Sequence, residues 1–287
     1  MDTYHVALVS GTPAVSFSDI ANVSAALQKQ VTRDFGPIWD VNATVDAFEN
    51  LDSVPTDYWP VIIEDNINEP GAAGYHTDKN GQPFSLVQAD DTWPLTASHE
   101  CLEMLADPFG NRTIAGSVPP QASSKLKKKL ARVLYLVEVC DPCEEGSFGY
   151  QSNGVGVSDF ITPHYYDPSV AASIQYSYSG NIKAPHQVLD GGYVSFGDPS
   201  TNEWYQVVVQ RGKAMTRSLG VLNTSGKSLR ETVDLRSREL TKGYRTGKLA
   251  SAKALAAAAG QNSGISEAAA GRAKSLRSYI DGLMKGR

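Results

Sequence analysis

The stretch Thr96-Ala-Ser-His-Glu-Cys-Leu-Glu-Met-Leu-Ala-Asp107-Pro108 carries the strongest structural signal in the chain. Pro94 precedes it at a position where a missing N–H costs little, and Thr96 or Ser98 can supply a capping oxygen. Because Pro108 cannot continue a helix, the pattern predicts a helix that ends one residue before this proline.

The polar residues of this helix have the spacing of a metal-binding motif. His99 and Glu103 are four residues apart, so their side chains lie on one face about one turn from each other. This matches the zinc motif His-Glu-x-x-His, with Glu103 in place of the second His, and a carboxylate is an accepted zinc ligand. The spacing predicts His99 and Glu103 as metal ligands and Glu100 as the general base.

A solvent-exposed helix face would also account for a His beside two Glu residues. Against this alternative, Leu95, Leu102 and Leu105 form an apolar stripe next to the polar face. An apolar stripe of this kind indicates a helix that packs on a core. The stripe therefore favours the metal interpretation over a loose surface segment.

The run Ser98-His-Glu-x-x-Glu-x-x-x-Asp107-Pro108 resembles the core of a zincin-like group of inferred metallopeptidases found in bacterial and phage proteins. In that group a strand ending in Glu-(Ile/Val)-x-Asp-x-Cys follows the helix, and this chain has Glu138-Val-Cys-Asp-Pro-Cys143 at the corresponding place. Ala26–Trp39 also resembles the N-terminal helix of the group. The resemblance covers residues 4–210 and implies an α+β fold, with a zincin-like mixed sheet and a metal-motif helix.

The resemblance also implies a function. It implies a peptidase that holds one Zn²⁺ per chain and hydrolyses peptide bonds through a metal-activated water. Glu138 is the first choice for the third protein ligand, Asp107 is the alternative ligand, and Asp141 is a residue that orients a ligand or replaces one. The implied partner is a peptide or protein substrate.

Glu138 also stands out without the resemblance. It is the one charged residue in the apolar run Val133–Val139, which the sequence predicts to be a buried strand. An unpaired buried carboxylate is very costly, so Glu138 needs a partner. Zn²⁺ and a Lys or Arg from elsewhere in the chain both remain open as that partner.

The N-terminal part of the chain shows strand and helix signals in alternation. A helix is predicted from Ser16 or Ser18 to Phe35, ended by Gly36-Pro37, and Asp78-Lys-Asn-Gly81 contains an Asn-Gly pair typical of a hairpin. This is the order of a zincin N-terminal half, whose last strand is an exposed edge to which an extended peptide could add. The strands predicted here are Tyr4–Val9, Val41–Phe48, Trp59–Asp65, Gly74–Thr77 and Pro83–Gln88.

The remaining histidines carry weaker signals. His164 could donate to a developing oxyanion, but an ordinary surface loop is the favoured interpretation. His5, His76 and His186 are predicted to be structural. After His186, Val188–Phe196 and Trp204–Gln210 are predicted to pair as strands.

The composition is that of a folded protein rich enough in apolar residues to bury a core. The chain has 287 residues, of which 41% are hydrophobic and 20% charged. Its three cysteines, Cys101, Cys140 and Cys143, are too few for a disulfide scaffold, and Cys140 and Cys143 could form a tight disulfide, a redox pair or half of a zinc site. We see no signal peptide and no membrane-spanning run, so we expect a cytoplasmic or virion-internal protein.

Charge divides the chain near residue 224. Residues 225–287 hold 13 of the 26 Lys and Arg residues but only 5 of the 31 Asp and Glu residues. This predicts a zincin-like domain at 1–224 and a basic, Ala-rich helical tail at 225–287, joined by few apolar contacts.

The basic tail supports an alternative function. A catalytically silent structural or assembly protein, such as a phage virion component, would use residues 225–287 to dock on a particle or on another copy of the chain. Nucleic acid is a less favoured partner because no recognition motif accompanies the charge, and we expect no membrane partner.

Overall fold

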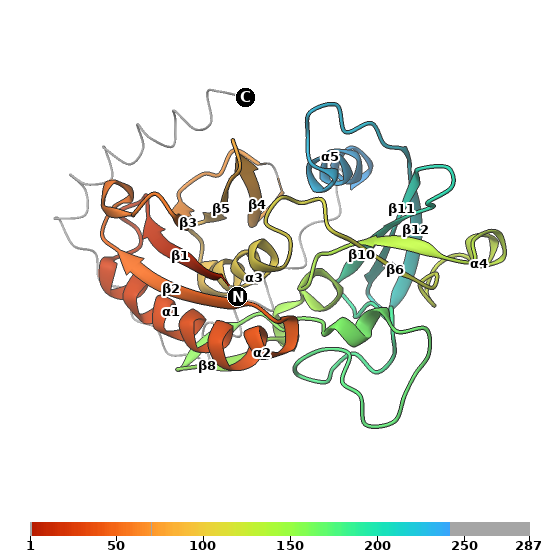
Figure 1. The fold of residues 1–287 in the computed structure, drawn as a ribbon, viewed down its shortest axis with the longest axis horizontal. Helices are drawn as coiled ribbons and strands as arrows, with labels where there is room; N and C mark the ends of the chain where they lie inside the picture. The colour runs from red at the N-terminus through yellow and green to blue at the C-terminus, as the bar shows by residue number, and fades with distance from the viewer. Residues whose placement is uncertain (1, 70, 242–287) are drawn as a thin grey trace. The chain divides into compact units, whose positions relative to one another are not determined.

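The computed structural model describes residues 2–69 and 71–241, with side chains through Arg238 (Figure 1). Contacts divide these residues into two compact units. Unit 1 comprises residues 2–108 and 150–157, and unit 2 comprises residues 109–149 and 158–241. The described chain has a mixed α/β architecture with few helices, and its first sheet is mixed, as predicted.

Unit 1 is built on a five-stranded mixed sheet with the order β2-β1-β3-β5-β4. Strands β1, β2, β3 and β5 are parallel, and β4 is antiparallel to β5 at the edge. The predicted hairpin is confirmed, because β4 and β5 are joined by Asn80 and Gly81, both at positive φ. The elements are β1 (Thr3–Ser10), α1 (Phe17–Lys29), η1 (Gln30–Phe35), α2 (Gly36–Trp39), β2 (Asn42–Phe48), η2 (Leu51–Ser53), β3 (Tyr58–Glu64), β4 (Gly74–Lys79), β5 (Gln82–Gln88), α3 (Trp93–Ala106), β8 (Tyr150–Ser152) and β9 (Val155–Val157).

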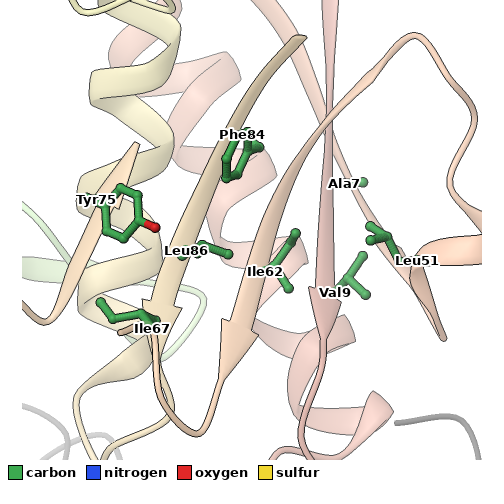
Figure 2. Close-up of a cluster of buried hydrophobic side chains, with 8 residues drawn as sticks. All are labelled: Ala7, Val9, Leu51, Ile62, Ile67, Tyr75, Phe84 and Leu86. Carbon is green, nitrogen blue, oxygen red and sulfur yellow. The ribbon is translucent and has the colours of Figure 1, made fainter. Parts of the chain in front are cut away.

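One face of this sheet carries an apolar cluster, and the other face packs against helices. Alternate side chains of the strands, together with Leu51 and Ile67 from the connections between strands, form one apolar cluster, shown in Figure 2. The intervening side chains meet the helices, because α1 packs on β1 and β2 while α3 packs on β3, β4 and β5. The cluster in Figure 2 consists of Ala7, Val9, Leu51, Ile62, Ile67, Tyr75, Phe84 and Leu86.

The first helix starts as predicted and ends later. Ser16 caps α1 in a capping box with Asp19. The prediction that Gly36-Pro37 ends the helix is wrong, because helical backbone continues to Trp39 and stops at Asp40 in the left-handed region. The segment η1 is a π-helix, and Pro37 then occupies the first turn of α2, where its missing N–H costs little.

Unit 2 contains a five-stranded antiparallel sheet with the order β12-β11-β10-β7-β6. The predicted pairing of two strands around residues 198–201 is confirmed by β10 and β11. Strand β12 was not predicted, because its polar and apolar residues do not alternate and only Leu219 of its nine residues is buried. The elements are β6 (Thr113–Gly116), α4 (Ser124–Lys129), β7 (Val133–Leu136), η3 (Asp141–Cys143), η4 (Gly146–Phe148), η5 (Pro163–Tyr166), β10 (Tyr193–Gly197), β11 (Glu203–Gln210), β12 (Lys213–Val221) and α5 (Leu229–Thr241).

Helix α5 lies within the predicted tail and packs in unit 2. Val233 is 1% exposed and belongs to a cluster with Trp204 and Leu136, against which Leu229 also packs. The expectation of few apolar contacts is therefore wrong for the start of the tail. The helices predicted within residues 242–287 lie outside the described residues. Within residues 2–69 and 71–241, no helix has the length and apolar character needed to cross a membrane.

Val233→Ala should lower the free energy of unfolding by about 1–3 kcal/mol, because it removes buried methyl groups from this cluster. Leu235, on the same helix, is 42% exposed, so Leu235→Ala should change stability by less than about 0.5 kcal/mol. Denaturant titrations of both variants measure the difference. Equal effects would show that α5 does not pack through Val233.

His186 is structural, as predicted, and is buried among aromatic rings of unit 2. Its ring stacks on Tyr135 at 5.0 Å between centroids, and its backbone N–H donates to the carbonyl oxygen of Tyr165. Burial lowers the pKa of His186 to about 4, because the charged imidazolium is desolvated. The backbone of His186 has φ 58°, in the left-handed region.

Lower pH should destabilise unit 2 through His186. Its pKa is below the ordinary value of 6.5, so the unfolded chain binds this proton first, and stability falls as pH drops from about 6.5 towards about 4. The full effect is about 3 kcal/mol. His186→Asn keeps a residue that tolerates positive φ. Because it removes the titrating group, it should lower the slope of the unfolding free energy against pH in this range by the contribution of one proton. Unchanged slopes in denaturant titrations at several pH values would contradict the assignment.

Candidate metal centre

Helix α3 begins one turn before the caps predicted for it. Thr92 is the N-cap and Pro94 lies in the first turn, so the prediction of Thr96 or Ser98 as the cap is wrong. The hydroxyl of Ser98 instead donates to Gln30 Oε1 at 2.8 Å, and both side chains are fully buried. The predicted end is confirmed, because Asp107 is the C-cap residue.

The polar face of α3 is buried. Glu103 is 0% exposed and Glu100 is 4% exposed, so the alternative of a solvent-exposed face is wrong. Most of the helix is buried as well, except for the half-buried Leu95, Thr96 and His99, and burial raises the pKa of the Cys101 thiol to about 12. Cys101 is therefore an inert packing residue at neutral pH. A helix that buries two carboxylates must supply partners for their charge.

The two predicted ligands of α3 lie close together. His99 Nε2 and Glu103 Oε1 are 3.3 Å apart. A hydrogen bond between charged partners is shorter, at about 2.7–2.9 Å. Two ligand atoms that share a tetrahedral zinc ion, each about 2.0–2.1 Å from it, are about 3.3 Å apart. The separation therefore fits two ligands of one ion.

His76 joins this group from the neighbouring strand β4. Its Nδ1 lies 3.5 Å from Glu100 Oε2 and 3.9 Å from Glu103 Oε2, and the residue is 3% exposed. From the sequence alone, His76 is predicted to be structural. Strand alternation could have found it, because Tyr75 belongs to the apolar cluster and the next side chain must point to the face that α3 covers.

A glycine allows β4 to approach α3. A Cβ added to Gly74 would lie 2.7 Å from Thr96 Cγ2 and 2.9 Å from Glu100 Cγ. A Cβ at these distances would force the side chains of Thr96 and Glu100 to shift. The close approach keeps Glu100 and His76 in contact.

Asp107, the predicted alternative ligand, contacts the group through its backbone. Its carbonyl oxygen lies 3.0 Å from His76 Nε2, and its N–H donates to the carbonyl oxygen of Glu103 at 2.8 Å. The residue is buried at the end of α3. Its role as a ligand remains a prediction.

Glu138 and Asp141 belong to unit 2. Glu138 is buried just after β7, and its Oε2 lies 3.2 Å from Nε of the equally buried Arg230. Of the two partners that the sequence left open, an arginine is the one that unit 2 provides. Asp141 is buried at the start of η3, between Cys140 and Cys143, which are buried thiols without a disulfide. Metal binding by Glu138 and Asp141 remains a prediction.

His164 lies on the exposed surface of unit 2. Its Nδ1 forms a 2.8 Å ion pair with Asp167 Oδ2, and the two side chains are 52% and 39% exposed. This agrees with the surface-loop interpretation.

Comparison with known proteins gives no match: no family model, no curated protein and no solved structure matches the chain. The kind of site is therefore inferred from the side chains of the described residues. Two groups of His, Glu and Asp side chains, one containing His76 and Glu103 and the other His99 and Glu103, have ligand atoms within 4.8 Å of one another and could hold a metal ion.

Removing His99 should abolish metal binding. Purified protein should contain about one divalent ion per chain, and His99→Ala should lose it because one ligand is gone. His164→Ala is the matched control, since it removes an exposed His that also has a carboxylate neighbour. Elemental analysis after removal of loosely bound metal measures the content. Equal content in wild type and His99→Ala would contradict the site.

Proposed function

We propose that the chain is a zinc-dependent peptidase with a zincin-like unit 1. The observation that carries the proposal is the 3.3 Å approach of His99 to the fully buried Glu103 on α3, with Glu100 between them in sequence. This is the geometry that the His-Glu-x-x-His spacing produces, with a carboxylate as the second ligand.

The order of elements in unit 1 supports the zincin-like part of the proposal. A zincin N-terminal half runs strand, helix, strands, hairpin and metal-motif helix. Unit 1 runs β1, α1, β2, β3, the β4–β5 hairpin and α3 (Figure 1). The sheet also ends in an antiparallel edge strand, β4, directly beside the motif helix.

The donor set suits zinc. Imidazole nitrogen and carboxylate oxygen are both accepted zinc ligands, although a set rich in carboxylates also admits other divalent metals. His99 and Glu103 would hold the ion from α3, with Glu138 as the third ligand predicted from the resemblance. When bound, the ion supplies Lewis acidity for the hydrolysis of a peptide bond.

Glu100 has the properties of a general base. Its carboxylate is buried, so a proton taken from the attacking water stays within the site. The 3.5 Å contact with His76 and the packing against Gly74 fix the position of its side chain. We assign the proton transfer to Glu100 and the metal binding to its neighbours.

The proposed substrate is an extended peptide. In the described sheet of unit 1, β4 pairs with β5 on one side only, which leaves main-chain groups for a further strand. An extended peptide can add to such an edge through backbone hydrogen bonds. This would place its backbone along the strand that carries His76.

The second candidate is a scaffold that binds metal without catalysis. The observation that favours it is the concentration of positive charge in residues 225–287, for which a peptidase has no use. Such a protein would dock on a particle or on a second copy of the chain through this segment. Both candidates fit a cytoplasmic or virion-internal protein.

Glu100→Gln separates the two functions. The substitution removes the proton acceptor while keeping the shape of the side chain, so metal content should not change. For a peptidase, turnover on a peptide library should fall about 10²–10⁴-fold. If neither wild type nor variant cleaves while both hold metal, the scaffold function replaces the peptidase. Equal cleavage by both proteins would rule out Glu100 as the base.

A further inference from the structure

We propose that His76 is itself a metal ligand, through Nδ1, so that the centre takes ligands from the edge strand β4 as well as from α3. This inference rests on the metal binding in the proposed function and adds a residue that the motif does not contain. Four observations on unit 1 support it.

The first observation is the placement of His76. Its side chain is 0% exposed and lies on the sheet face that α3 covers, whereas the preceding Tyr75 belongs to the apolar cluster on the opposite face (Figure 2). A one-residue change in register would turn the imidazole away from Glu100 and Glu103. The pairing of β4 with β5 therefore fixes His76 in the site.

The second observation concerns the tautomer. His76 Nε2 lies 3.0 Å from the carbonyl oxygen of Asp107, which can only accept a hydrogen bond. Nε2 must therefore carry a proton, and in the neutral ring Nδ1 holds the lone pair. Histidines that bind metals show this arrangement, with one nitrogen on the metal and the other donating to a backbone carbonyl or carboxylate.

The third observation is what Nδ1 faces. It faces two carboxylate oxygens, Glu100 Oε2 at 3.5 Å and Glu103 Oε2 at 3.9 Å. These separations exceed the about 2.7–2.9 Å of a charged hydrogen bond. Two ligands of one ion, each about 2.0–2.1 Å from it, can lie no more than about 4 Å apart. A cation shared by His76 Nδ1 and Glu103 Oε2 is compatible with their 3.9 Å separation, and Glu100, the proposed base, lies next to His76 without binding the ion.

The fourth observation is the position of Glu103 between two imidazoles. Its Oε1 faces His99 Nε2 and its Oε2 faces His76 Nδ1. One buried carboxylate thus contacts both histidines. A metal ion bound to this carboxylate would take ligands from both β4 and α3. Loss of either histidine should weaken binding.

The two histidines approach Glu103 through different nitrogens, which gives a test on the unaltered protein. We would label the five histidines with ¹⁵N and record two-bond ¹H–¹⁵N spectra before and after adding Zn²⁺. Coupling patterns distinguish Nδ1 from Nε2 coordination. We expect one imidazole bound through Nε2, from His99, and one bound through Nδ1, from His76. Coordination through Nε2 alone would overturn the inference.

Variants then identify the residue. His76→Gln should weaken Zn²⁺ binding more than about 100-fold, beyond the usual effect of removing a group that merely orients a ligand. His164→Gln, at the exposed His–Asp pair, should bind as wild type does. If His76→Gln keeps wild-type affinity while His99→Ala loses the ion, this inference fails and the proposed function stands. If His99→Ala also keeps the ion, the proposed metal site itself fails.

Discussion

The structure of unit 1 depends on the burial of Glu103. A carboxylate that is 0% exposed needs compensation for its lost hydration, and the compensating groups must stand at fixed places. Here they are imidazoles from α3 and from β4, so the requirement ties the helix to the edge of the sheet. The Asn80-Gly81 turn fixes the register of β4, and Gly74 removes the side chain that would hold β4 away from α3. The Asn80-Gly81 turn and Gly74 thus both help to place His76 beside the buried carboxylate of Glu103.

The parts of the fold that local chemistry determines were predictable from the sequence. The Asn-Gly turn, the Ser16 cap and the end of α3 before Pro108 each follow from the backbone preferences of a few adjacent residues. The pair His99 and Glu103 was predictable for the same reason, since helical spacing alone brings four-apart side chains together.

The parts that depend on distant residues were not predictable in this way. Thr96 and Ser98 looked like caps, but buried contacts with the π segment determine what Ser98 does. His76 entered the site only because α3 packs on β4, and no local pattern records that packing. An arginine partner of Glu138 comes from α5, more than ninety residues later, in a stretch that its charge alone had marked as a separate tail. In each case a tertiary contact overrode a local signal.

The π segment η1 sets a length requirement on the first helix. Gln30, its first residue, reaches Ser98 immediately before the candidate ligand His99. Each residue added to or removed from a helix rotates everything beyond it by about 100°. A related chain with one residue fewer between Ser16 and Gln30 would turn this glutamine to another face and release Ser98. The number of residues in this helix, and not only their identity, is therefore a property that divergence in such proteins would have to preserve.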